Sequence, residues 1–171
     1  MREGIISGAK EMTRRKFMKT SGASALVTAG TTGGALAGNA PQTKGKKSKK
    51  KVSTDRAPKP VGPYNQAIVA GNTIYVAGQG PFDPKTGKMA ATFDDQAVQV
   101  FENIKAIVEA AGATLADVVK VNVYLADLAN FAKMNEVYKR YFVEDYPARA
   151  TLGTQLLGGM GIEVECVAVK V

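Results

Sequence analysis

The chain from 57 to 171 shows two recurring patterns of apolar and polar residues, one with the period of a strand and one with the period of a helix. Strict alternation over about four to eight positions predicts a half-buried strand. Alternation and short apolar runs together predict strands at 67–70, 73–77, 119–125, 149–155 and 162–171. The first two strands flank Gly71-Asn72, a residue pair typical of the tight turn of a β-hairpin.

Apolar residues at helical spacing predict two helices between these strands. The first covers 94–111, with Asp94 or Asp95 as its N-cap and Gly112 as the residue that ends it. The second begins after Asp127, and its apolar residues are Leu128, Phe131, Met134 or Val137, Tyr138 and Phe142. The resulting order, ββαβαββ, predicts an α+β domain with both helices on one face of the sheet.

The last predicted strand is apolar on both of its faces. One face, suited to cover by the helices, carries Ile162, Val164, Cys166 and Ala168. The opposite face begins with two carboxylates and ends in valines; its residues are Glu163, Glu165, Val167, Val169 and Val171. The C-terminal half of that face is too apolar to be left in water. Because the pattern predicts no further helix to cover it, we expect an oligomer in which the sheets of several copies pack face to face.

Two features of the composition restrict the chemistry that the chain can perform. The sequence contains no histidine, which excludes Ser-His-Asp and Cys-His catalysis and HExxH zinc sites. Its one cysteine, Cys166, allows no intrachain disulfide and no cysteine zinc cluster. Acid–base chemistry near neutral pH must therefore use carboxylates, lysine, tyrosine, water or main-chain groups.

The positive charge of the chain is concentrated at its N-terminal end. Residues 1–56 contain 13 Lys or Arg and 3 Asp or Glu, a net charge of +10, whereas residues 57–171 contain 10 and 12, a net charge of −2. A nucleic-acid-binding domain carries its basic residues on the folded surface. We therefore expect no nucleic-acid partner.

Residues 1–37 contain the parts of an export signal in the usual order. The arginine pair Arg14-Arg15 precedes a weakly apolar stretch, 20–37, that ends in Ala35-Leu36-Ala37, a motif of the kind that signal peptidases cleave. This order is typical of a twin-arginine signal, so we expect export to the periplasm by the twin-arginine machinery. The alternative is a basic leader on a protein that stays in the cytoplasm. No apolar run reaches the roughly 20 residues of a membrane span, so we expect no stable membrane insertion.

Residues 38–56 are expected to form a disordered linker between this signal and the domain at 57–171. Residues 41–56 contain six lysines and one large apolar residue, Val52, which is too little apolar surface for a core. An alternative interpretation is that the lysines contact an acidic surface such as lipid head groups.

The predicted domain also carries a series of short motifs: GPYNQA at 62–67, AGQ at 77–79, NIKAIVEAAG at 103–112, YPAR at 146–149 and IEVE at 162–165. Together they resemble the motifs of the Rid/YjgF family, the RidA-like reactive-intermediate or imine deaminases, over essentially all of 57–171. The resemblance implies a chorismate-mutase-like fold with a mixed sheet, and a homotrimer whose sheets form a central barrel with sites in the subunit clefts. It also implies hydrolysis of small 2-imino acids, of the 2-iminobutanoate and 2-iminopropanoate type, to 2-oxo acids and ammonia without a metal or organic cofactor.

Two residues are the main candidates for this chemistry. By resemblance, Arg149 matches the family's carboxylate-binding arginine, and its planar guanidinium offers the paired donors that an imino acid's carboxylate requires. Glu163 matches the family's site glutamate; a carboxylate there can take a proton from the attacking water and then protonate the departing nitrogen. The alternatives are a salt-bridge role for Arg149 and a solvated strand position for Glu163, with Glu165 as a second candidate on the same face.

Four further residues complete the predicted substrate site: Tyr64, Gly78, Asn135 and Thr151. Tyr64 would pack over the substrate, Gly78 would leave room beside the main chain, and Asn135 would hydrogen-bond at the cleft. A half-buried tyrosine, a turn glycine and an exposed helix asparagine are the competing interpretations. Ala150-Thr151 stands where many family deaminases have Ser-Cys, and the turn at 156–161 is one residue shorter than usual; both differences bear on the substrate range.

A second class of function is a non-catalytic protein of the same fold that binds small carboxylated metabolites at subunit clefts. Such a protein would need Arg149 and would tolerate the loss of Glu163. The presence of both residues favours the enzyme.

Overall fold

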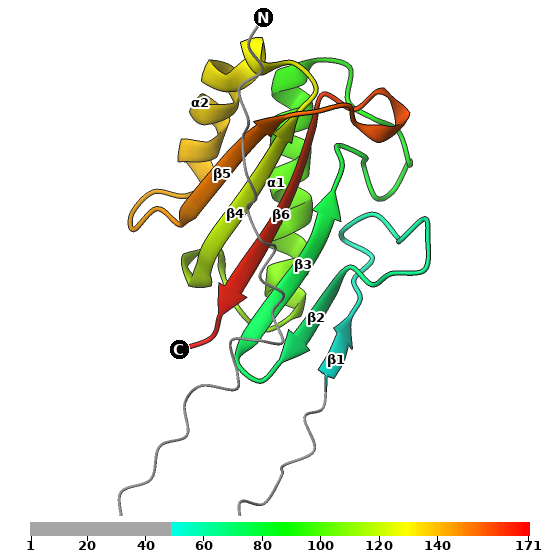
Figure 1. Ribbon diagram of the computed structural model, residues 1–171. Coiled ribbons are helices and arrows are strands. Elements are labelled where there is room, and N and C mark those ends of the chain that lie inside the picture. The colour runs from blue at the N-terminus through cyan, green and yellow to red at the C-terminus, as the bar shows by residue number, and fades with distance from the viewer. Residues whose placement is uncertain (1–48) are drawn as a thin grey trace, which may run out of the picture. The chain divides into compact units, whose positions relative to one another are not determined.

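Six strands form one mixed sheet in residues 49–171, the part of the chain that the computed structural model describes (Figure 1). They lie in the order β1-β2-β3-β6-β4-β5, and neighbours are antiparallel except for β4 and β5, which are parallel. The strands are β1 (Lys49–Val52), β2 (Ala67–Ala70), β3 (Thr73–Gln79), β4 (Val118–Leu125), β5 (Ala148–Gly153) and β6 (Ile162–Val169). The predicted hairpin is therefore confirmed as β2–β3, with Gly71 in the left-handed region at φ 63°.

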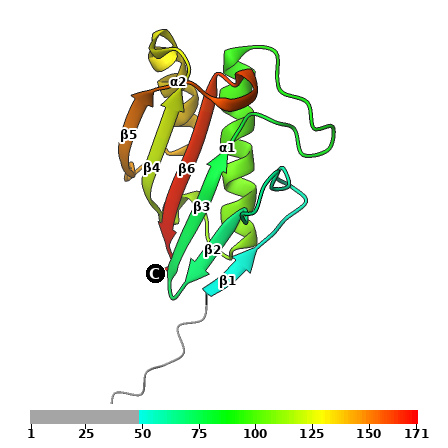
Figure 2. The ribbon, with the colours of Figure 1, turned by 45° about the vertical axis from the view of Figure 1, so that its right-hand side comes forward.

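Two helices, α1 (Phe93–Ala110) and α2 (Phe131–Tyr141), pack on the same face of this sheet (Figure 2). Three short 3₁₀ helices join the longer elements: η2 (Leu115–Asp117), η3 (Leu128–Asn130) and η4 (Leu157–Gly159). The N-cap of α1 is Thr92 rather than Asp94 or Asp95, because the Thr92 side chain accepts a hydrogen bond from the Asp95 amide. Asp127, predicted to cap the second helix, caps η3 through the amide of Ala129; η3 runs directly into α2, whose own N-cap is Asn130. One layer of mixed sheet covered by one layer of helices is the α+β architecture that the sequence predicts.

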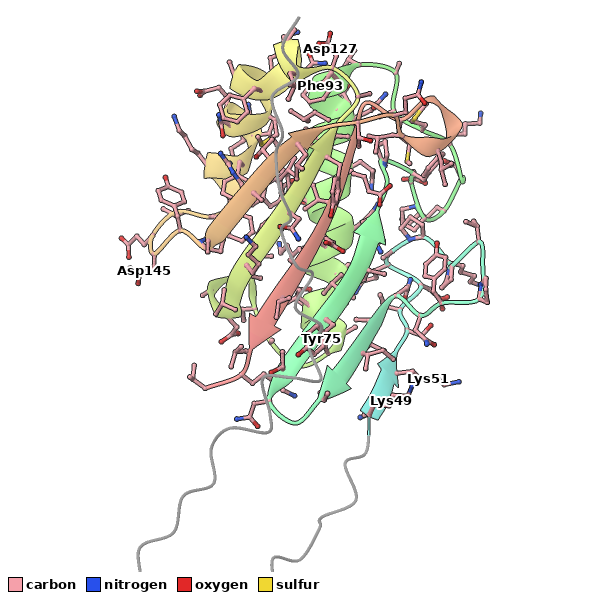
Figure 3. The ribbon with its side chains drawn as sticks, viewed as in Figure 1. Lys49, Lys51, Tyr75, Phe93, Asp127 and Asp145 are labelled. Carbon is pink, nitrogen blue, oxygen red and sulfur yellow. The ribbon has the colours of Figure 1, made fainter. Side chains whose placement is uncertain are left out.

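Alternation along the strands gives the sheet two different faces. The face under the helices carries a fully apolar core of Ile74, Val76, Val121, Val123, Leu125, Ile162, Val164, Cys166 and Ala168, all buried. The other face, called the open face below, has no helix of residues 49–171 over it. It carries Tyr75 on β3 (labelled in Figure 3), Asn122 and Tyr124 on β4, and Glu163, Glu165, Val167 and Val169 on β6. The prediction for the two faces of the last strand is thus confirmed.

The structure corrects the expected boundary between linker and domain. Lys49–Val52 forms the edge strand β1, which pairs with β2 from Lys49 opposite Ala70 to Val52 opposite Ala67. Val52 is buried, and the three lysines are exposed. A lysine-rich sequence lacks the apolar pattern of a strand, but lysines are well tolerated at a sheet edge, where they discourage pairing with another chain.

Gln66 fastens the chain that follows β1 to the rest of the domain. This buried side chain donates from Nε2 to the carbonyl oxygens of Thr54 (3.0 Å), Ala57 (3.1 Å) and Pro58 (2.8 Å), and it accepts from the Thr54 amide. Residues 54–58 therefore belong to the folded domain as well.

The predicted signal, residues 1–37, and the first part of the predicted linker, 38–48, lie outside the described residues. Within 49–171, neither helix is long and apolar enough to cross a membrane.

Candidate functional site

The two residues expected to carry the chemistry lie on opposite faces of the sheet. Arg149 of β5 lies beside Val121 of β4, so it points to the helix-covered face, whereas Glu163 of β6 lies opposite Tyr124 on the open face. Side chains of directly paired residues point to the same side of a sheet, and successive residues alternate. One chain alone therefore does not bring Arg149 and Glu163 together. They belong to two separate groups, called the Arg149 half-site and the Glu163 half-site below.

The Arg149 half-site is built on the sheet-facing side of α2. The Arg149 guanidinium lies 4.6 Å from the ring centre of Tyr138 and 5.8 Å from that of Phe131, and its Nη1 lies 3.9 Å from Sδ of Met134. These contacts orient the guanidinium through ring faces and a sulfur atom. Within 49–171 no carboxylate lies within ion-pair distance of it. The cation is positioned and still free to bind an anion.

Asn135 and Arg149 line one cavity of about 300 Å³, together with Tyr138, Lys139, Tyr146 and Pro147. This volume fits a small molecule, and the two cations on its wall suit a carboxylate. The prediction that these two residues act at one site is consistent with this geometry. The loop before β5, which carries the outer wall, turns at Asp145 (labelled in Figure 3), whose φ of 49° lies in the left-handed region that Asp tolerates better than most residues.

Two hydroxyl groups near Arg149 are buried without a hydrogen-bond partner among the described residues: those of Tyr138 and Thr151. Burial raises the pKa of Tyr138 to about 12, although the positive charge of Arg149 opposes the shift, so the phenol stays neutral. Thr151 lies two positions after Arg149 on the same face, but it does not line the cavity. Its predicted contact with substrate is therefore not formed in the single chain.

The Glu163 half-site lies on the open face, where β3, β6 and β4 run side by side. The Glu163 carboxylate lies directly over Gly78 of β3, and a Cβ at position 78 would come within 3.0 Å of the Glu163 carboxyl carbon. The missing side chain at Gly78 is thus what allows Glu163 its position. Burial, and to a smaller extent the charge of Glu165, raise the pKa of Glu163 above its ordinary value.

Hydrogen bonding distinguishes the two candidate carboxylates on this face, Glu163 and Glu165. Oε1 of Glu165 accepts from Nδ2 of Asn122 (2.8 Å) and from the hydroxyl of Tyr124 (3.0 Å). For Glu163 there is no such donor among residues 49–171. Glu163 is therefore the carboxylate that is free to accept a proton, and Glu165 is held in place.

Tyr64 and Cys166 lie outside the cavity that contains Arg149. Tyr64 lies on the loop before β2, with 46% of its surface exposed and its hydroxyl accepting from the Val61 amide at 3.3 Å. It does not line the Arg149 cavity. Cys166 lies in the core, and burial raises the pKa of its thiol to about 12, so it is no nucleophile. Within 49–171 no group of Asp, Glu or Cys side chains is arranged to hold a metal ion.

The aromatic support of Arg149 is the part of the site that the sequence analysis missed. Phe131 and Tyr138 were assigned to the apolar face of a helix, yet Phe131 is 44% exposed and both rings lie against the guanidinium. Met134 and Asn135 complete the set. Their spacing (131, 134, 135, 138) places all four on one helix face, and that spacing was the available signal.

An antiparallel sheet with one parallel edge pair and two helices on one face is a fold shared with a known class of proteins. The sequence profile of the family described as Endoribonuclease L-PSP matches residues 54–170. The chain belongs to this family, which is also the Rid/YjgF family, and it has its chorismate-mutase-like fold.

Individual relatives agree with this assignment. A RutC family protein of Pyrococcus horikoshii is 54% identical over 124 residues, covering 71% of this chain and 98% of that protein. A protein of Dermatophagoides farinae named 2-iminobutanoate/2-iminopropanoate deaminase is 42% identical over 123 residues, covering 71% and 96%. The structure of Escherichia coli TdcF with bound serine superposes with a TM-score of 0.70 at 40% identity, covering 71% of this chain and 99% of that one.

Proposed function

We propose that the protein is a hydrolytic deaminase that converts small 2-imino acids, of the 2-iminobutanoate and 2-iminopropanoate type, to 2-oxo acids and ammonia. The observation that carries the proposal is a pair of unsatisfied groups with complementary chemistry. Arg149 is oriented in a small cavity without a carboxylate partner, and Glu163 is a half-buried carboxylate without a donor among residues 49–171. Arg149 suits the carboxylate of the substrate, and Glu163 suits the proton transfers at its imine group.

The reaction needs only water and these groups. Arg149 binds the carboxylate of the imino acid through two parallel hydrogen bonds and so fixes the imine carbon. The substrate reacts as the protonated imine: water adds to its carbon while Glu163 accepts one of the water's protons, which gives a tetrahedral amino alcohol. Glu163 then gives that proton to the amino nitrogen. The carbon–nitrogen bond breaks and ammonia leaves as the hydroxyl proton passes back to Glu163 and the carbonyl forms, and Glu163 releases this proton to solvent. The proposed reaction uses no metal and no organic cofactor.

The proposed site is completed by a second copy of the chain. Because Arg149 and Glu163 point to opposite faces of one sheet, a substrate that touches both must lie between two copies. We propose a homotrimer in which the open faces pack toward the centre, so that each cleft combines the Arg149 half-site of one copy with the Glu163 half-site of its neighbour. Tyr64 and Thr151 would acquire their substrate contacts in the same cleft.

The names of two relatives support the same chemistry. The Dermatophagoides farinae protein is named for this imine hydrolysis, and the TdcF structure holds serine, an amino acid whose carboxylate is of the type that Arg149 suits. The family description also mentions an endoribonuclease. RNA cleavage is less well supported by this chain, because residues 57–171 carry a net charge of −2 and the whole chain has no histidine for acid–base transfer.

The test uses the full chain and imines made in the cuvette by an amino-acid oxidase from alanine or 2-aminobutanoate. We expect 2-oxo acid to form faster than in buffer alone. Arg149→Lys keeps the charge but loses the forked geometry, and we expect at least about a tenfold loss of kcat/KM. Glu163→Gln keeps the shape but cannot accept a proton, so kcat should fall while 2-oxobutanoate binds as before. Equal rates with wild-type protein and with buffer would refute the deaminase and leave the carboxylate-binding protein.

A further inference from the structure

Four polar side chains form a compact square on the open face. Asn122 lies opposite Glu165, and Tyr124 lies opposite Glu163, on the adjacent strands β4 and β6. The Tyr124 hydroxyl does not reach straight across to Glu163. It reaches diagonally to Oε1 of Glu165 at 3.0 Å, the same oxygen that accepts from Asn122 at 2.8 Å. The Asn122 amide and the Tyr124 hydroxyl thus both donate to Glu165 and not to Glu163.

The two donors are neutral, and this decides their effect. Hydrogen bonds from neutral groups orient a carboxylate without placing a positive charge beside it, unlike bonds from lysine or arginine. Asn122 and Tyr124 therefore hold the Glu165 carboxylate in one position, two residues along β6 from Glu163.

The other groups that face Glu163 do not offset this charge. On β3, the neighbour of Glu163 is Gly78, which carries no side chain, and the nearest ionisable residue of that strand on the open face is Tyr75, opposite Val167. On β4, the cation on the open face is Lys120, also opposite Val167. Lys120 is four residues from Tyr124, a separation of about 13 Å along the strand. Among the described residues, Glu165 is accordingly the charge-bearing side chain closest to Glu163 on this face.

We propose that Asn122 and Tyr124 are positioning residues of the proposed deaminase, which hold Glu165 as a fixed negative neighbour and thereby strengthen Glu163 as a proton acceptor. Glu163 must take a proton from a poor acid, water, and then give it to nitrogen, so a moderately strengthened base serves both steps. The raised pKa of Glu163, with burial as its first cause and Glu165 as its second, agrees with this arrangement. The inference rests on the proposed function for its purpose, but the electrostatic coupling can be measured without it.

A purely structural role for the same hydrogen bonds would be to fasten β4 to β6. Titration of Glu163 distinguishes the two roles, because fastening two strands does not require a charge at Glu165. Glu165→Gln keeps the size and an acceptor oxygen but removes the charge. Tyr124→Phe keeps the ring and removes one donor. Tyr75→Phe makes the same chemical change on the same face at a hydroxyl that donates no hydrogen bond to Glu165, so it is the matched control.

The experiment follows side-chain carboxyl signals of glutamate in ¹³C-labelled full-length protein as a function of pH, with Glu163→Gln used to assign the Glu163 signal. We expect the Glu163 midpoint to move to lower pH in Glu165→Gln, to move less far in the same direction in Tyr124→Phe, and to stay in place in Tyr75→Phe. The acid limb of kcat/KM should move to lower pH in the same order, since Glu163 must be ionised to accept a proton.

An unchanged Glu163 midpoint in both Glu165→Gln and Tyr124→Phe, with an intact amide spectrum, would overturn the proposal. So would an equal shift in Tyr75→Phe. The carboxyl titration can be read in protein that hydrolyses no imine, so a failure of the coupling and a failure of the proposed function give different results.

Discussion

At the scale of single residues, the proposed chemistry depends on which groups are absent around Arg149 and Glu163 among the described residues. Arg149 lacks a carboxylate partner within residues 49–171, and Glu163 lies over a glycine instead of a side chain. Arg149 and Glu163 stand out in the sequence because their motifs resemble those of the family, and their roles stay a prediction. The distinction between Glu163 and Glu165 could not be settled by alternation, since both occupy one face. It follows from hydrogen bonds to β4, a strand some forty residues away in the sequence.

Gly78 provides a direct test of the Glu163 half-site. In Gly78→Ala, the new Cβ would collide with the Glu163 carboxylate, so the carboxylate must move away from its position. We expect a loss of at least about tenfold in kcat, because a misplaced base cannot reach the attacking water. Thermal unfolding should change little, since the strained group is the end of a flexible side chain. Gly87→Ala is the comparison variant. A Cβ at Gly87 would meet no neighbouring atom, so its effect on thermal unfolding reflects the positive φ of Gly87 and not a collision. Full activity in Gly78→Ala would show that the observed position of Glu163 is not needed.

At the scale of elements, apolar periodicity predicted the two helices and the five strands after residue 57, and it failed for β1. Periodicity reports burial, and β1 contributes only Val52 to the core, while its backbone supplies the pairing with β2. An edge strand that is held mainly by main-chain hydrogen bonds need not show alternating apolar and polar residues, so the sequence pattern does not reveal it. Periodicity also cannot tell a core residue from an apolar residue that lines a site. The pattern places Phe131 in the core, whereas the structure places it half-exposed beside Arg149.

The open face of β6 makes a prediction of its own about assembly. Val167 lies in the apolar half of this face, and in the proposed trimer it would be buried between copies. Val167→Asp would bury an unpaired charge there, at a cost of several kcal/mol, so we expect smaller species in light scattering. Val143→Asp is the matched control, since Val143 is 72% exposed in a loop outside the sheet. An unchanged oligomer in Val167→Asp would assign the interface to another face.

At the scale of the whole molecule, the sequence divides into a strongly basic N-terminal part and a slightly acidic domain. We propose that residues 1–37 direct the chain through the twin-arginine route to the periplasm. In Arg14→Lys/Arg15→Lys, charge is kept and the arginine pair is lost, so the precursor should accumulate in the cytoplasm. Cell fractionation checks this outcome. Export of the double variant in cells that have only the general secretory route would remove the assignment.

Each proposed site draws Arg149 and Glu163 from two different copies of the chain, and mixed oligomers test this arrangement most directly. Arg149→Lys and Glu163→Gln chains are unfolded together and refolded at equal amounts, and imine hydrolysis is compared with that of each variant refolded alone. Random mixing into a closed trimer places an intact Arg149 beside an intact Glu163 at about one quarter of the sites. We therefore expect the mixture to recover about one quarter of the wild-type rate. A mixture no more active than the separate variants, with mixed trimers present, would contradict it, because the two residues would then have to act from one chain.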